Sequence, residues 1–126
     1  MKKLVFLAVL TFILGSTLAQ SAVIPSVTFT SNPNKFNDKI VTVTDAGMVR
    51  SNDKATYTRC HIPAGFEKVN VMFKSDPDFE GCFFMQRRLA NAVTNRLRPH
   101  GLTPVQITFK GSKRTGYIIT LFRLAR

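Results

Sequence analysis

Short segments in which apolar and polar residues alternate make up much of the chain beyond its first twenty residues. A period of two is typical of a strand with one buried face. The segments are Ile40–Arg50, Thr56–Ile62, Lys68–Lys74, Val105–Lys110 and Tyr117–Leu124. One further segment, from Cys82 to Leu97, repeats its apolar residues with helical spacing. The order strand-strand-strand-helix-strand-strand predicts a mainly β fold with one helix, of the α+β kind.

Residues at the ends of these segments predict where strands bend and where the helix begins and ends. Asp45-Ala46-Gly47 interrupts the first strand and predicts a bulge or bend. Ser75 or Asp76 is expected to cap the helix, and Pro99 to stop it. Val23–Thr30 is expected to be a short β lead-in, interrupted by Pro25. Lys113 and Arg114 lie in a predicted hairpin loop between the last two strands.

Three carboxylates, Asp76, Asp78 and Glu80, precede the predicted helix in a spacing similar to that of a calcium loop. An EF-hand needs a bidentate glutamate at the twelfth position of the loop, and Arg87 stands there. We therefore reject a calcium site and expect the carboxylates to stabilise the positive end of the helix. No metal site and no cofactor is predicted.

The first residues have the pattern of a secretory signal peptide. Lys2 and Lys3 precede the apolar run Leu4–Leu14, and small residues follow up to Ala19. We expect cleavage near Ala19, or after Ser21, which assigns residues 1–19 to the signal peptide and residues 20–126 to a single domain. The predicted location is periplasmic or secreted, with no transmembrane span after cleavage.

Export changes what the two cysteines, Cys60 and Cys82, are expected to do. In an oxidising compartment two thiols of one small domain usually form a disulfide. A Cys60–Cys82 bond would close a loop of about 22 residues and would stabilise the fold by about 3 kcal/mol in the chain-entropy model. We predict this disulfide, the alternative being two buried free thiols.

The positive charge of the chain is concentrated in its second half. The protein has 126 residues and a net charge of +11. All seven acidic residues lie before Gly81, whereas Gly81–Arg126 contains nine basic residues and no acidic one. Such a segment favours an anionic partner, namely an envelope polymer, a lipid surface or an acidic protein. Nucleic acid is possible but not favoured, and the oligomeric state is not predicted. The alternative is that the charge only keeps the protein soluble.

Residues Asn32–Thr44 read Asn-Pro-Asn-Lys-Phe-Asn-Asp-Lys-Ile-Val-Thr-Val-Thr, and Val105–Lys110 is followed by Gly111. With the order of elements, these features resemble the OB-fold, a five-stranded Greek-key barrel. The resemblance covers Asn32–Leu124 and departs from the pattern where the glycine of the first strand comes late, at Gly47. It implies a five-stranded OB-like barrel that binds ligands across its second and third strands. The competing architecture is an open sheet covered by the helix.

Two sets of residues are candidates for a binding surface. On the outward face of the expected second and third strands, an aromatic ring lies beside cations and could hold an anionic ligand; this set is Tyr57, Arg59, His61 and Lys74. The second set combines the cations of the predicted helix with those of the hairpin tip: Arg87, Arg88, Arg96, Arg98, Lys113 and Arg114. For both sets the alternative is an ordinary solvated surface.

The sequence favours an exported binding or accessory module that is not an enzyme. One alternative is a membrane-active or antagonistic protein whose basic helix carries Phe83 and Phe84 and disrupts anionic bilayers. A less favoured alternative is a small basic ribonuclease that uses His61 and His100 as acid and base.

Overall fold

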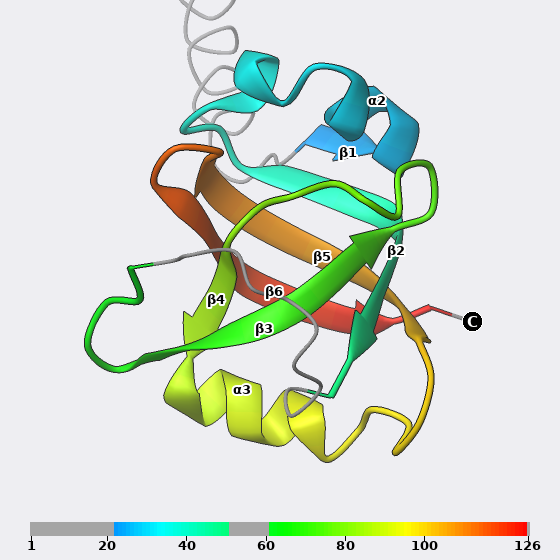
Figure 1. Ribbon diagram of the computed structural model, residues 1–126, viewed down its shortest axis with the longest axis vertical. Helices are drawn as coiled ribbons and strands as arrows, with labels where there is room; N and C mark the ends of the chain where they lie inside the picture. Colours follow the sequence, from blue (N-terminus) through cyan, green and yellow to red (C-terminus); the bar gives the residue numbers. More distant parts are fainter. Residues whose placement is uncertain (1–21, 51–60, 126) are drawn as a thin grey trace, which may run out of the picture.

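The computed structural model describes residues 22–50 and 61–125 (Figure 1). The predicted signal peptide, Tyr57, Arg59 and Cys60 lie outside the described residues. The elements in chain order are β1 (Ala22–Ile24), α2 (Ser26–Ser31), the 3₁₀ helix η1 (Pro33–Phe36), β2 (Val41–Val49), β3 (Phe66–Phe73), β4 (Phe83–Gln86), α3 (Arg87–Thr94), β5 (Thr103–Ser112) and β6 (Gly116–Leu124).

Five strands close into a barrel in the order β2-β3-β4-β6-β5, and β5 pairs again with β2. The β4–β6 pair is parallel, and the other four pairs of the barrel are antiparallel. β1 adds to β2 as a short parallel strand outside the ring. The predicted mainly β fold, a five-stranded barrel with one helix before its last two strands, is confirmed.

A bulge in β2 sets which of its residues face the core. Pairing with β5 shifts register between Val43 and Ala46. Val41 and Val43 are fully buried before the bulge, and Ala46 and Met48 are buried after it. Because one extra residue is inserted, the inward positions change from odd to even numbers. The bulge predicted at Asp45–Gly47 is confirmed.

The core is aromatic, and each end of the barrel is covered by a helix. At one end α2 inserts Phe29, which is fully buried. Its ring lies 5.0–5.9 Å, between centroids, from the rings of Phe36, Phe73, Phe79, Phe109 and Tyr117. At the opposite end α3 packs its apolar face on the strands (Figure 1). Inward alternation of Val105, Ile107 and Phe109 in β5 is as predicted.

The second and third strands of the barrel are not the segments that the sequence assigned to them. His61 and Ile62, the described end of the predicted strand Thr56–Ile62, lie in a loop, so that prediction is wrong there. The second barrel strand is β3, predicted as the third. The third is β4, whose residues were assigned to the start of the helix. Phe83 and Met85 point into the core from β4, whereas Phe84 lies between them on the other face of the strand. Two neighbouring phenylalanines therefore fit a strand.

The helix α3 is shorter than predicted and begins differently. It spans 8 residues and ends at Thr94, five residues before Pro99. Its N-cap is Gln86, and its first turn contains no acidic residue. The predicted caps, Ser75 and Asp76, lie instead in the loop between β3 and β4 together with Asp78 and Glu80. The expectation that these carboxylates stabilise the helix start is therefore wrong.

The N-terminal segment is helical where a strand was expected. Only Ala22–Ile24 is β, and Ser26–Ser31 forms α2 directly after Pro25. Pro25 can stand at this point because the first amides of a helix have no partner inside it. In α2, Ser26 and Phe29 lie three residues apart and are both buried, so one face of the helix points into the barrel.

Cys82 lies just before β4, and its carbonyl accepts a hydrogen bond from the Tyr117 amide at 2.7 Å. No cysteine within the described ranges is free. The predicted pairing joins Cys82 to a residue outside those ranges and stays a prediction. Among the helices of the described residues, none is both long enough and apolar enough to cross a membrane.

Candidate anion-binding site

α3 carries its arginines outward because its apolar residues hold the other face against the barrel. Ala90 and Val93, three residues apart, are both about 2% exposed. Leu97 follows at i+4 and is buried as well. The helix start is tied to the barrel by the Arg87 amide, which donates to the Gly65 carbonyl at 3.0 Å. The Arg87 and Arg88 side chains are left facing solvent.

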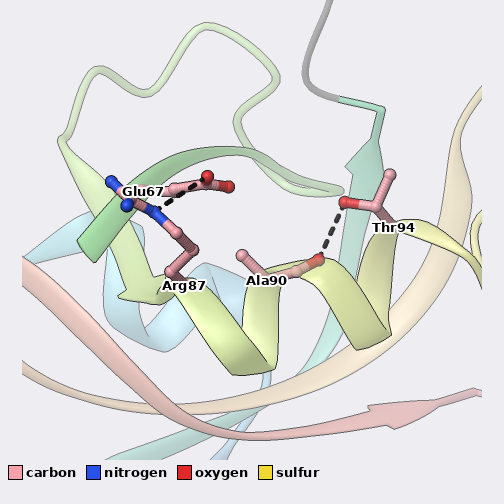
Figure 2. Close-up of polar contacts among 4 residues, drawn as sticks. All are labelled: Glu67, Arg87, Ala90 and Thr94. Carbon is pink, nitrogen blue, oxygen red and sulfur yellow. Dashed lines mark hydrogen bonds and ion pairs between the residues drawn. The ribbon is translucent and has the colours of Figure 1, made fainter. Parts of the chain in front are cut away.

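Arg87 is partly neutralised by an acidic neighbour on β3. Its Nε lies 3.4 Å from Glu67 Oε1, and the two side chains are 63% and 44% exposed (Figure 2). An exposed pair of this kind contributes about 0.2–1 kcal/mol. It therefore orients the guanidinium, whose remaining N–H groups can still reach a ligand.

The chain that leaves α3 presents two further arginines. The Thr94 hydroxyl donates to the Ala90 carbonyl at 2.8 Å in the last turn (Figure 2). Arg96 then lies with its guanidinium carbon 5.6 Å from the centre of the Phe122 ring on β6. The Arg98 amide donates to Thr103 Oγ1 at 2.9 Å. The first contact holds the Arg96 side chain against β6, and the second fixes the backbone of Arg98. Both residues remain exposed.

Arg50, at the end of β2, joins this end of the barrel and was not predicted as a site residue. Its guanidinium donates to the Leu97 carbonyl at 3.3 Å. Its Nε is buried and has no hydrogen-bond partner among residues 22–50 and 61–125. In the sequence Arg50 is one basic residue in a half without net charge, so the sequence gives no reason to group it with the arginines of α3. Its position becomes evident only where the end of β2 contacts the segment after α3.

The arrangement puts five guanidinium groups at one end of the barrel, and we call it the arginine end: Arg50, Arg87, Arg88, Arg96 and Arg98. A guanidinium is planar, always charged and able to grip a carboxylate, sulfate or phosphate with two parallel hydrogen bonds. Lysine, by comparison, is a strongly hydrated point charge. The arginine end is therefore chemically suited to oxyanions.

The second predicted set does not form one surface. Lys113 and Arg114 lie in the turn between β5 and β6, at the end of the barrel that α2 covers (Figure 1). There the Lys113 ammonium lies 5.8 Å from the centre of the Phe79 ring. The four arginines of the set belong to the other end. The prediction that helix and hairpin cations share a patch is wrong, because the barrel lies between them.

The first predicted set is only partly within the described residues. His61 is exposed in the loop before β3, and Lys74 is exposed directly after β3. On the strands themselves, Phe66 and Phe84 stand next to each other with ring centroids 6.0 Å apart. Phe84 is buried yet lies outside the core cluster. The sequence missed this pair because it placed Phe84 in the helix.

The structure also places the residues that the two alternative activities would use. Phe83 and Phe84, which the membrane-active alternative needs on the helix, belong to β4 and are buried. His61 and His100 are both exposed. Over residues 22–50 and 61–125 no group of three or more metal-ligating side chains is found.

Comparisons with protein families, with curated proteins and with solved structures find no match to this chain.

Proposed function

We propose that this protein is an exported, non-enzymatic binding module of OB-like fold, secured by a Cys60–Cys82 disulfide. In this proposal it contacts an anionic envelope component or an acidic protein partner through the arginine end. The supporting observation is the gathering of Arg87, Arg88, Arg96 and Arg98, all exposed, around one helix and the chain that follows it.

The chemistry of the arginine end also supports an extended acidic partner over a small ligand. The four exposed arginines come from two turns of helix and the segment after it, so their charges are spread over a surface. A polymer or protein with repeated oxyanions can engage them simultaneously, and each added contact raises the effective concentration for the next. Binding of this kind weakens as salt rises.

Heparin provides a sulfated polyanion to test the proposal. We compare the wild type with a variant in which Arg87, Arg88, Arg96 and Arg98 are all replaced by glutamine. A matched control replaces four exposed cations of the other end, Lys35, Lys39, Lys113 and Arg114, and so removes the same charge. The arginine variant should elute from a heparin column at clearly lower salt than the control.

Equal losses in the two variants would reject the arginine end and would indicate an effect of net charge alone. Vesicles that contain phosphatidylglycerol, tested with the same two variants, separate a lipid surface from a polymer. Export is tested independently by fractionating the native host and determining the N-terminus by mass spectrometry. An uncleaved N-terminus in the cytosol would reject the exported part of the proposal.

A further inference from the structure

A second cationic surface lies at the end of the barrel opposite the arginine end, and the cations that line a hollow there are lysines. The Asp38 amide donates to the Gly111 carbonyl at 3.0 Å, which ties the segment after η1 to the β5–β6 hairpin. Beside this tie a hollow of about 530 Å³ is lined by Lys35, Lys39 and Lys110. Its other walls include Phe36 and Ile40.

A second hollow, of about 440 Å³, adjoins the first and shares Asp38 and Lys110 with it. Its lining is largely apolar and includes Pro63, Phe84 and Ile118. Gly116 belongs to the same wall, and a Cβ there would lie 2.7 Å from the Phe84 ring. The glycine therefore brings the backbone of β6 directly against this ring. Each hollow falls within the size range of small-molecule sites, about 300–1,000 Å³.

The two hollows differ in charge, and this difference limits the ligand. Three lysines and one carboxylate, Asp38, line the first, and the structure describes no ion pair between Asp38 and these lysines. The lining of the second holds no cation besides Lys110. A polyanion with evenly spaced charges would leave charges over the apolar part without a partner. A ligand with one anionic end and one apolar end satisfies both parts.

We propose that the two adjoining hollows together bind a single-chain anionic amphiphile as a monomer. Its phosphate or carboxylate head lies among Lys35, Lys39 and Lys110, and its alkyl chain lies over Phe84 and Ile118. The apolar half supplies burial of the chain, and the lysines supply attraction for the head. This site is separate from the arginine end, so either proposal can fail without the other.

Dodecyl phosphate, kept below its micelle concentration, is the probe, and binding is measured by calorimetry. Replacing Lys35, Lys39 and Lys110 together by glutamine should weaken binding about tenfold, as expected for three exposed charge contacts. Ile118→Ser should also weaken binding, because Ile118 is 36% exposed and would contact only the alkyl chain of the ligand. Inorganic phosphate and dodecyl maltoside, each with half of the required chemistry, should both bind more weakly than dodecyl phosphate.

The matched control replaces three cations outside both hollows and outside the arginine end, Lys74, Arg114 and Arg123, by glutamine, and it should bind dodecyl phosphate as the wild type does. The proposal is overturned if the lysine variant binds like the wild type, or if the control variant loses as much binding as the lysine variant. Equal affinity for dodecyl maltoside would also overturn it, since the head would then be irrelevant. Circular dichroism of each variant shows that the barrel is retained.

Discussion

Asp45, in the bulge of β2, holds Ser26, the first residue of α2. The carboxylate accepts a hydrogen bond from the Ser26 amide through Oδ1 and from the Ser26 hydroxyl through Oδ2, the latter at 3.0 Å. The Ser26 hydroxyl lies 2.9 Å from Ser75 Oγ and accepts from the Ser75 amide. Ser26 is fully buried. This contact fixes α2 to the barrel and to the β3–β4 loop.

Replacing Asp45 by alanine should lower the free energy of unfolding by about 1–3 kcal/mol, because the buried Ser26 amide and hydroxyl lose their acceptor. Asp78→Ala removes an exposed carboxylate of the β3–β4 loop and should change stability by less than about 0.5 kcal/mol. Urea unfolding of both variants provides the measurement. A loss in Asp45→Ala no larger than in the control would contradict the role assigned to this contact.

Replacing Phe29 by alanine should lower the free energy of unfolding by about 3–5 kcal/mol, since the ring fills the centre of the aromatic cluster. Val27 lies on the same helix and is 53% exposed. Val27→Ala should therefore have little effect, and it controls for the properties of α2 itself. Thermal and urea unfolding of the two variants give the comparison, and equal stability would show that Phe29 does not secure the barrel.

Tyr117 predicts a dependence of stability on alkaline pH. Burial raises the pKa of its phenol to about 12, and its hydroxyl has no hydrogen-bond partner among the residues that the structure describes. The unfolded chain releases this proton near pH 10. The contribution of the Tyr117 phenol to the free energy of unfolding is therefore fully present below pH 10 and is lost as the pH rises through 12. Tyr117→Phe should remove this contribution to the pH dependence and should not destabilise the protein at pH 7. Urea unfolding across pH 8–12 measures both, and an unchanged pH profile in the variant would contradict the prediction.

Gly116→Ala should destabilise the protein more than Gly65→Ala. Both glycines have positive φ, 97° and 84°, so alanine is strained at either position. At Gly65 a Cβ would have no neighbour within 4 Å, whereas at Gly116 it would lie 2.7 Å from the Phe84 ring. The strain alone should cost about 1 kcal/mol or more. Equal costs in the two variants would show that Phe84 yields without penalty.

The sequence predicted the parts of the fold in which local pattern and tertiary packing agree. Val105, Ile107 and Phe109 alternate and face the core, and β2 bulges where Asp45-Ala46-Gly47 interrupts its alternation. The predicted start of the helix was wrong because Met85 fits both the helical spacing from Cys82 and the alternation of a strand with Phe83. Only pairing with β3 and β6, both distant in the chain, selects the strand.

Four of the five residues of the arginine end were named from the sequence, whereas Arg50 and the arrangement of the group were not. Arg87, Arg88, Arg96 and Arg98 were named from charge alone, and they do lie at one end of the barrel. Lys113 and Arg114 were grouped with them because all six cations belong to the basic second half of the chain. The charge of a segment does not indicate which end of a barrel its hairpin occupies. Ser75 has the chemistry of a helix cap, but its hydroxyl bonds to Ser26 across the fold.

Phe29 fills one end of the barrel core, although it belongs to α2 and not to one of the five barrel strands. The Phe29 side chain packs against Phe73 of β3 and Phe109 of β5. Its removal would therefore leave a void between two strands on opposite sides of the barrel. A shortened form of the chain that starts after Ser31 would keep all five barrel strands but would lack the Phe29 side chain. A recombinant form of the domain should therefore retain α2 (Ser26–Ser31), because a chain that begins at Asn32 lacks the ring that fills this end of the core.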